Sequence, residues 1–108
     1  MERLRRRTDF LAAAGGVKVA TAAFVLQVRK RGVDGPVRVG FTVSKKVGNA
    51  AERNRGRRRL REIVRLSAAE DLTSGHDYVL IGRRAALSLP FERLSEDFKR
   101  ALRRVRAP

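Results

Sequence analysis

The most informative stretch of the chain is residues 44–61, which read SKKVGNAAERNRGRRRLR. Asn49 is followed three residues later by Glu52, the spacing of a capping box in which each side chain binds the backbone N–H of the other residue. This pattern predicts a helix that begins at Asn49 and continues to about Leu66. Its apolar face consists of Leu60, Ile63 and Val64, with Gly56 on the same arc.

Arginine covers most of the remaining surface of this predicted helix. Arg53, Arg57, Arg61 and Arg65 stand four residues apart, and like charges at that spacing destabilise an isolated helix by about 0.2–0.5 kcal/mol per pair. An array of phosphates on a partner would offset this repulsion, because the planar guanidinium group forms paired hydrogen bonds with phosphate and stacks on bases. A solvated basic face or a nuclear-localisation-like cluster is the alternative interpretation. The density of arginine favours a nucleic-acid surface.

The composition of the whole chain points the same way. Lysine and arginine number 26 against 11 acidic residues, a formal charge of +15 over 108 residues. Self-repulsion of this size destabilises the free protein. Nucleic acid is the usual polyanion that relieves it, and an anionic membrane surface is the other physical option. An apolar fraction of 43% still allows a packed core, so we predict one nucleic-acid-binding domain spanning residues 1–108.

The compartment is inferred from what the sequence lacks. The chain has no cysteine for a disulfide or a thiolate metal site, and no apolar run approaches the roughly 20 residues of a membrane span. Residues 3–7 and 10–14 faintly resemble the basic and apolar parts of a signal peptide, but Asp9 and the break at residues 15–18 leave the apolar stretch too short. We therefore expect a cytoplasmic protein.

The remaining strand signals predict an α+β fold with a small mixed sheet packed by helices. Alternating apolar and polar residues indicate strands over residues 24–29 and 37–43, and the segment 30–36 between them reads as a turn. We expect these two strands to form a hairpin with one apolar face and one mixed, open face. The apolar run 78–81 predicts a third, buried strand.

Two further helices complete the predicted order α-β-β-α-β-α. Thr8 is placed to cap a short helix over residues 9–14, which Gly15 would end. Pro90 suits the first turn of a last helix. The apolar stripe of that helix consists of Phe91, Leu94, Phe98, Ala101 or Leu102, and Val105. The phenylalanines expected in the core are Phe24, Phe41, Phe91 and Phe98, whereas Phe10 suits either the core or stacking on a base.

The central motif resembles that of a known family. Residues 45–50, followed by Arg53-Asn54-Arg55 and a basic helix, resemble the signature of the bacterial ribonuclease P protein family. Residues 39–44, residues 24–26 and the N-terminal segment, Arg3-Leu4-Arg5 with Thr8-Asp9-Phe10, are also similar to it. The order of elements agrees along nearly the whole chain.

Three positions depart from the family pattern. Gly56 stands where an aliphatic residue is usual, which costs a helix interior up to about 1 kcal/mol relative to alanine and removes a core contact. Ala14 stands where a second aromatic often follows Phe10, and Gln27 stands where an aromatic often sits. The last two reduce the stacking that a groove for single-stranded RNA could offer.

The resemblance implies a fold, an activity and partners. The fold resembles the ribosomal protein S5 domain 2-like fold, with a left-handed β-α-β crossover. The partners are a large catalytic RNA and precursor tRNA, which is cut at the 5′ end of the mature sequence, while Mg²⁺ ions are held by the RNA. The protein is then the non-catalytic subunit of an endoribonuclease, with no metal site, no membrane partner and no small-molecule substrate.

The resemblance also implies two binding surfaces. The first contacts the catalytic RNA and consists of Lys45, Lys46, Arg53, Asn54, Arg55, Arg57, Arg58, Arg59, Arg61 and Arg65. The second holds the single-stranded 5′ leader of precursor tRNA and consists of Phe10, Val25, Gln27, Thr42 and Ser44. Stacking on Phe10 would tolerate any leader sequence, because every base has a π face.

Three other functions stay open from the sequence. A structural ribosomal or other RNA-binding protein with no role in tRNA processing shares every compositional feature, and only the motif at residues 45–55 argues against it. A metal-dependent nuclease acting alone needs a cluster of ligands, which no spacing of the acids suggests, and the single histidine, His76, is more typical of a structural residue than of a general base. A DNA-binding module is disfavoured because arginine on all sides leaves few side chains to read base edges.

Overall fold

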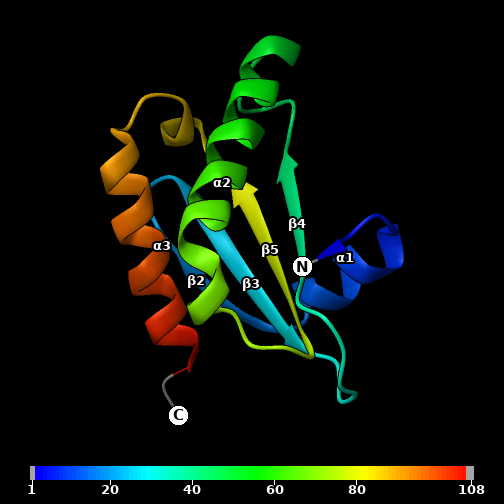
Figure 1. Ribbon diagram of the computed structural model, residues 1–108. Helices are drawn as coiled ribbons and strands as arrows, with labels where there is room; N and C mark the ends of the chain where they lie inside the picture. Colours follow the sequence, from blue (N-terminus) through cyan, green and yellow to red (C-terminus); the bar gives the residue numbers. More distant parts are fainter. Residues whose placement is uncertain (1, 107–108) are drawn as a thin grey trace.

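Five strands form one mixed sheet in the computed structural model, which describes residues 2–106 except for the side chains of residues 68–71. The strands are β1 (Glu2–Arg3), β2 (Val17–Ala20), β3 (Phe24–Lys30), β4 (Arg38–Val43) and β5 (His76–Gly82). They lie in the order β1-β4-β5-β3-β2 (Figure 1). β4 is parallel to β1 and β5, whereas β3 is antiparallel to β5 and β2.

Helices cover both faces of this sheet. α2 (Ala50–Asp71) and α3 (Phe91–Arg106) pack on one face, and the short 3-10 helix η1 (Arg84–Leu87) leads from β5 to α3 (Figure 1). α1 (Arg7–Ala14) packs on the other face. Strand side chains alternate between two apolar clusters: Leu26 and Leu80 belong to the main core under α2 and α3, and Val79 belongs to a smaller cluster under α1.

The connection from β4 through α2 to β5 is left-handed. β4 and β5 are parallel neighbours, and α2 crosses in front of the sheet from the upper end of β4 to the lower end of β5, which lies to the left of β4 (Figure 1). Crossovers between parallel strands of one sheet are right-handed in about 98% of cases. The chain therefore has the rare connection that the family resemblance implies.

The arginine-rich helix begins as predicted. The Asn49 N–H donates to Glu52 Oε1 at 3.0 Å and the Glu52 N–H donates to Asn49 Oδ1 at 2.9 Å, which completes the capping box. α2 then runs beyond the predicted end at Leu66, because no glycine or proline interrupts the chain until Gly75. The third strand is confirmed within β5, and the last helix is confirmed directly after Pro90.

The hairpin predicted from residues 24–29 and 37–43 is wrong. Both segments are strands, but β5 lies between them and pairs with each, so that Leu80 is opposite Leu26 on one side and Phe41 on the other. Alternation shows which face of a strand is buried but not which strand lies beside it. The run 78–81 is apolar on both faces, which suits a strand in the middle of a sheet.

The N-terminal part of the chain differs in detail from the prediction. Thr8 does not cap α1, which begins at Arg7 after an Arg6 that makes no side-chain cap, whereas Gly15 does follow its last residue. Sequence analysis missed β1 and β2, which have two and four residues and are too short for alternation to be recognised. The observed order, β-α-β-β-β-α-β-α with η1 before α3, still confirms the α+β class.

The phenylalanines predicted for the core divide into two groups. Phe24 and Phe98 are fully buried and lie edge to face, with ring centroids 6.3 Å apart. Phe41 and Phe91 are only half-buried and pack against the edge of the main core. Phe10 is also half-buried, against the smaller cluster.

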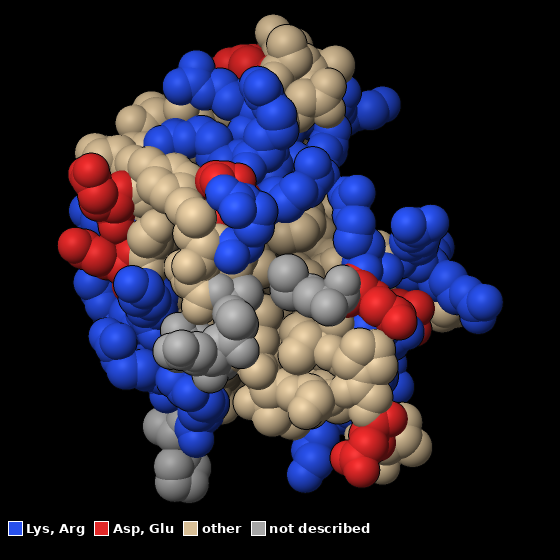
Figure 2. All heavy atoms as spheres, in the orientation of Figure 1, with Lys and Arg blue, Asp and Glu red and all other residues tan. Residues whose placement is uncertain are grey.

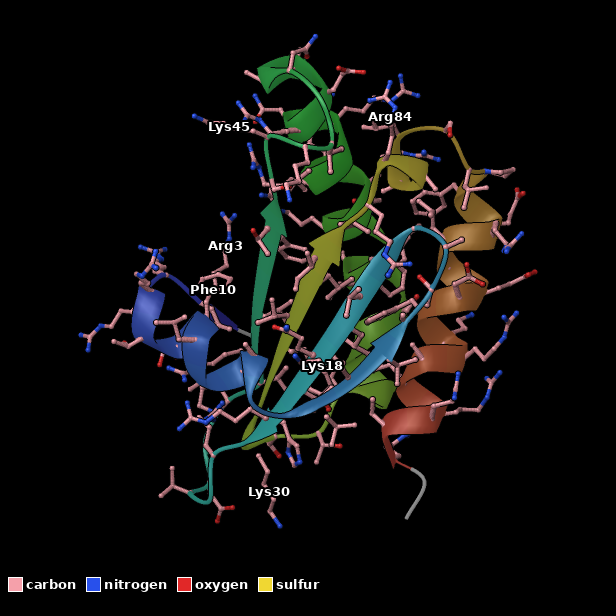
Figure 3. The ribbon with its side chains drawn as sticks, turned by 180° about the vertical axis from the view of Figure 1, so that it is seen from behind. Arg3, Phe10, Lys18, Lys30, Lys45 and Arg84 are labelled. Atoms are coloured by element: carbon pink, nitrogen blue, oxygen red, sulfur yellow. The ribbon has the colours of Figure 1, made fainter. Side chains whose placement is uncertain are left out.

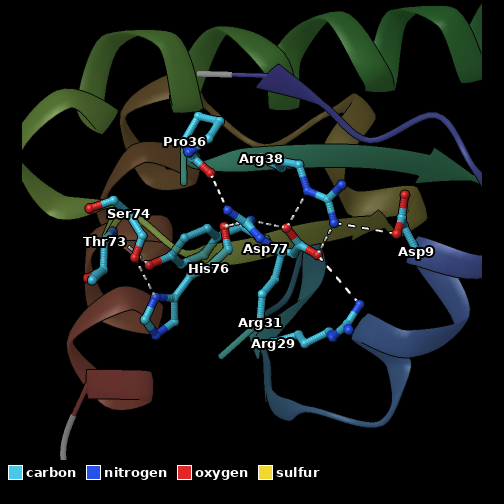
Figure 4. A network of polar contacts seen from close by, with 10 residues as sticks. Asp9, Arg29, Arg31, Pro36, Arg38, Thr73, Ser74, His76 and Asp77 are labelled. Atoms are coloured by element: carbon cyan, nitrogen blue, oxygen red, sulfur yellow. Dashed lines mark hydrogen bonds and ion pairs between the residues drawn. The ribbon is translucent and has the colours of Figure 1, made fainter. Parts of the chain in front are cut away.

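A buried carboxylate joins three strands and α1 (Figure 4). Asp77 in β5 is fully buried, and Arg38 in β4 donates to its two oxygens through Nε and Nη2, each at 2.8 Å. Arg31, which follows β3, donates to it at 2.6 Å, and Arg38 also reaches Asp9 of α1 at 3.4 Å. Burial alone would raise the pKa of Asp77, but the hydrogen bonds from Arg38 and Arg31 hold that pKa below its ordinary value of 3.8.

Asp77→Asn is expected to lower the free energy of unfolding by about 3 kcal/mol, the low end of the range for breaking a buried ion pair. The substitution keeps the shape of the side chain but leaves Arg31 and Arg38 without their counter-charge. The measurement is a urea unfolding curve at neutral pH. Glu62→Gln, which breaks an exposed pair with Arg65, is the matched control and should leave the midpoint unchanged. Equal midpoints for the two variants would contradict the role of Asp77.

The same network predicts how stability depends on pH. The folded pKa of Asp77 is lower than the unfolded one, so its contribution is complete above the ordinary value of 3.8 and is lost as the pH falls through the folded pKa. Below about pH 4 the wild-type chain should therefore lose stability more steeply than Asp77→Asn. Parallel acid unfolding curves would count against this assignment.

Gly56→Ala is expected to stabilise the chain by about 1 kcal/mol, the difference in helix propensity between the two residues. Gly56 is buried in α2, and a Cβ there would lie 3.6 Å from Leu87 Cδ2 and 3.8 Å from Val43 Cγ2, which are ordinary contacts. At Gly82 a Cβ would lie 2.9 Å from Val43 Cγ2, so Gly82→Ala serves as the contrasting variant and should destabilise. Urea unfolding of both variants tests the pair, and a loss of stability in Gly56→Ala would refute it.

Candidate nucleic-acid interface

The residues predicted to contact the catalytic RNA lie on α2 and on the turn before it. Figure 2 shows lysine and arginine side chains over the upper half of α2. Lys45 and Lys46 are exposed in the turn before the helix, and Arg53 and Arg57 are half-buried. The exposed members within the helix are Asn54, Arg55, Arg58, Arg61 and Arg65.

These cations differ in whether the chain itself binds them. Arg57 Nη2 donates to Asn54 Oδ1 at 2.6 Å, and Arg65 pairs with Glu62 and holds the pKa of that carboxyl below its ordinary value. Among the described residues, Arg55 and Arg58 have no hydrogen-bond or ion-pair partner. Their guanidinium groups are therefore available to a ligand.

Arg59 has a different position from its neighbours. It is half-buried, and its Nη1 and Nη2 donate to the backbone carbonyls of Ala86, at 2.7 Å, and Leu89. Burial, with a contribution from the nearby charge of Arg55, lowers the pKa of Arg59. Arg59 thus connects α2 to η1 and to the segment between η1 and α3, and its predicted contact with RNA stays a prediction.

Arg84 of η1 is a structural residue that sequence analysis missed. Its guanidinium donates to the carbonyl of Val47 and lies 3.6 Å from Glu52, the capping-box acid. It therefore holds the turn that carries Lys45 and Lys46 against the start of α2. Nothing in the sequence around residue 84 indicates a contact with residue 47.

A groove of about 470 Å³ lies on the opposite face of the sheet, beside α1. It brings together Phe10, Gln27 and Thr42 of the predicted leader-binding set. Val25, half-buried in β3, and Ser44, exposed just after β4, do not line it. The other lining residues are Arg5, Arg7, Leu11, Ala14, Phe41, Val79 and Ile81.

The position of Phe10 in this groove depends on a glycine. A Cβ at Gly40 would lie 2.6 Å from Phe10 Cε1, so the ring packs directly on the backbone of β4. Ala14 and Gln27, two of the departures from the family pattern, line the same groove. Phe10 is therefore a half-buried ring with one edge on the sheet and one side in the groove. Ala14 and Gln27 lie where aromatic residues would add further surface for stacking.

The two surfaces meet at the edge of β4. Phe41 lines the groove, and the guanidinium carbon of Arg61 in α2 lies 5.9 Å from the centre of its ring. Figure 3 shows Arg3, Phe10 and Lys45 along this side of the molecule. Cationic residues thus continue from the groove round the edge of the sheet to α2.

The described residues include neither a cluster of metal-binding side chains nor a helix that could span a membrane. Among the described side chains, no group of three or more histidine, cysteine, aspartate or glutamate residues could hold a metal ion. His76 Nδ1 lies 3.0 Å from the carbonyl oxygen of Ser74, at the far end of the sheet. In the described part of the chain, no helix has the length and apolar character needed to cross a membrane.

Comparison with known proteins identifies the family. The family model described as Ribonuclease P matches residues 1–106. The chain belongs to the ribonuclease P protein family. It is 50% identical to the ribonuclease P protein component of Ruegeria pomeroyi, over 97% of this chain and 86% of that protein. It is 48% identical to the component of Caulobacter vibrioides, over 94% of this chain and 68% of that protein.

Solved structures of ribonuclease P proteins confirm the fold. The protein from Thermotoga maritima superposes with a TM-score of 0.80 at 32% identity, covering 99% of this chain and 100% of that one. The protein from Staphylococcus aureus gives 0.79 at 27% identity, covering 98% and 96%. The resemblance drawn from residues 45–55 is therefore confirmed, and with it a role as a protein component of an endoribonuclease ribonucleoprotein that processes tRNA.

Arg59→Ala is expected to destabilise the chain by about 1.5–3 kcal/mol, the range for hydrogen bonds that involve a charged group. The variant leaves the carbonyls of Ala86 and Leu89 without their donor. Arg58→Ala, one residue away and exposed, is the matched control and should unfold at the wild-type urea concentration. If Arg59→Ala also unfolds at that concentration, the hydrogen bonds from Arg59 to the carbonyls of Ala86 and Leu89 contribute nothing to the free energy of unfolding.

Proposed function

We propose that the chain is the RNA-binding subunit of ribonuclease P, which binds the catalytic RNA through α2 and the turn before it. The groove beside α1 then holds the 5′ leader of precursor tRNA. The observation that carries the proposal is the pairing of these two surfaces. Arg55 and Arg58 on α2 have no partner among the described residues, and a half-buried aromatic ring lies in a groove that meets the α2 surface at Phe41 and Arg61.

The surface on α2 suits a folded RNA better than a small anion. Its cations occupy successive turns of a long helix, so they match a row of phosphates and not a single one. Arg55 and Arg58 are exposed and have no partner among the described residues, so both guanidinium groups can bind phosphate oxygens. The turn held by Arg84 adds Lys45 and Lys46 to the same surface.

The groove suits a single strand of variable sequence. Phe10 offers one π face without base-specific hydrogen bonds, and Arg5 and Arg7 stand beside it for the backbone phosphates. Thr42 and Gln27 contribute polar groups on the floor of the groove. The leader would run from this groove past Phe41 toward the RNA bound on α2.

In this proposal the side chains bind and orient but do not react. The Mg²⁺ ions that activate water and stabilise the leaving oxygen are assigned to the RNA, as the family resemblance implies. The chain holds the leader next to the catalytic RNA and neutralises phosphates of the leader and of the catalytic RNA. Such positioning lowers the Mg²⁺ concentration at which the two RNAs associate, since protein cations replace metal ions as counterions.

The first test is cleavage of precursor tRNA at low Mg²⁺ by three samples: the protein alone, a bacterial ribonuclease P RNA alone, and the two combined. We expect cleavage in the mixture that is absent or far slower in either component. Failure of the protein to improve cleavage by the RNA would refute the subunit role in this reaction. Cleavage by rigorously RNA-free protein would instead place the catalytic groups in this chain.

Arg55→Ala and Arg58→Ala should each weaken binding to the catalytic RNA and reduce the slope of log K against log salt by up to about one, the effect of losing one phosphate contact. The matched control is Lys30→Ala, an exposed cation at the end of the sheet far from Lys45 (Figure 3), which should leave the slope unchanged. A filter-binding series over several salt concentrations provides the measurement. Unchanged slopes in both arginine variants would contradict the assigned surface.

A further inference from the structure

A second groove lies on the α2 side of the molecule, between α2 and the first turn of α3. It has a volume of about 570 Å³ and is lined by Arg55, Arg58, Arg59, Glu62 and Phe91. Its volume falls within the range of small-molecule binding sites. A neighbouring groove along the same helix also includes Arg58 but has no aromatic residue. It is lined by Ala51, Asn54, Arg57, Arg58 and Arg61.

Phe91 gives this groove its chemical character. The ring was expected in the core, but it is only half-buried: it packs against the edge of the main apolar cluster and lines the groove. A half-buried aromatic ring beside arginines offers a flat apolar surface next to positive charge. That combination suits a nucleobase and its phosphate better than it suits phosphate alone.

The ring is also held in a defined position. Phe91 is the first residue of α3, and the preceding Pro90 accepts the N–H groups of Arg93 and Leu94. Arg59 of α2 donates to the carbonyl of Leu89, two residues before the ring. The aromatic surface is therefore fixed relative to α2 before any ligand arrives, which lowers the entropic cost of binding.

The other lining residues complement a nucleotide. Arg55 and Arg58 are exposed and have no partner among the described residues, so both can bind phosphate. Glu62 adds a carboxylate, whose pKa is held low by the hydrogen bond from Arg65. An ionised carboxylate accepts hydrogen bonds from the amino group of a base and would repel a second phosphate.

We propose that this groove binds an unpaired nucleotide of the catalytic RNA, with its base on Phe91 and its phosphate between Arg55 and Arg58. The proposal rests on the proposed function and refines it, because it requires an unstacked base at the α2 surface in addition to phosphates. A base within a regular duplex could not reach the ring, since its faces are covered by its neighbours. The RNA would therefore present a bulge, loop or junction to the space between α2 and α3.

The test is to replace the ring while keeping its packing. Phe91→Leu retains an apolar side chain against the core but removes the π face, and Phe91→Tyr retains the face. We expect Phe91→Leu to weaken binding to ribonuclease P RNA by about five- to 150-fold, the effect of losing one base–aromatic stack, with an unchanged salt slope. Phe91→Tyr should bind like the wild type. Urea unfolding of both variants establishes that they are folded under the binding conditions.

Chemical probing of the RNA gives an independent measurement. The wild type and Phe91→Tyr should protect one unpaired base from modification, and Phe91→Leu should leave the same base reactive. The matched control is Phe10→Leu, in the groove on the opposite face, which should weaken binding of precursor tRNA without affecting this base.

Several results would overturn the proposal. Wild-type affinity of Phe91→Leu, equal losses in the Leu and Tyr variants, or a reduced salt slope in Phe91→Leu would each show that the ring does not stack on a base. If the wild-type protein does not bind the RNA at all, the proposed function itself fails. If the wild-type protein binds the RNA and Phe91→Leu binds it equally tightly, the nucleotide site alone is refuted.

Discussion

The buried carboxylate of Asp77 is the interaction on which the arrangement of the sheet depends. A charged group without solvent is stable only when its oxygens are bonded, and here Arg38 and Arg31 supply those bonds from β4 and from the end of β3. The requirement is met when β5 lies between β3 and β4, which is the observed order. Arg38 also binds Asp9, so the same cluster holds α1 against the sheet and, with it, Phe10 in the groove.

The arginines of this chain therefore serve two purposes that their number does not reveal. One group satisfies groups within the fold: Arg31 and Arg38 bind Asp77, Arg59 binds the carbonyls before α3, and Arg84 binds the turn before α2. A second group, which includes Arg55 and Arg58, has no partner among the described residues. The internally bonded arginines hold the surfaces in position. The arginines without a partner give those surfaces the positive charge that would attract RNA in the proposed function.

Local features of the fold could be predicted from the sequence, whereas contacts between distant segments could not. The capping box, the strands β3, β4 and β5 and the last helix follow from spacing over a few residues, and each was found where expected. The pairing of β3 and β4 with β5 depends on a strand more than 30 residues away, which alternation does not encode. Sequence periodicity reports on a few neighbouring residues. The helix was therefore predicted correctly, whereas the pairing of the strands was not.

The candidate site was predictable to the same extent. The motif at residues 45–55 located the basic helix, but it treats Arg58 and Arg59 alike, although the structure exposes the first and bonds the second to backbone carbonyls. Adjacent residues on a helix point about 100° apart, and the position of η1 and the segment after it decides which of the two arginines faces solvent. Phe91 was predicted for the core for a related reason, because an apolar residue in an amphipathic stripe is expected to be buried, and the stripe does not show where the core ends.

The division between bonded and unbonded arginines also explains how so basic a chain can fold before it binds. Like charges on α2 oppose folding, and the burial of Arg59 near Arg55 adds to that cost. The internal arginines offset part of it, because each satisfies carbonyls or a carboxylate that would otherwise be left unbonded. In the proposed function, phosphates of the RNA would relieve the remaining repulsion among the exposed arginines. In the proposed function, RNA binding would therefore stabilise the folded chain by the same interactions that give it affinity, and the aromatic rings beside those cations would already be in place.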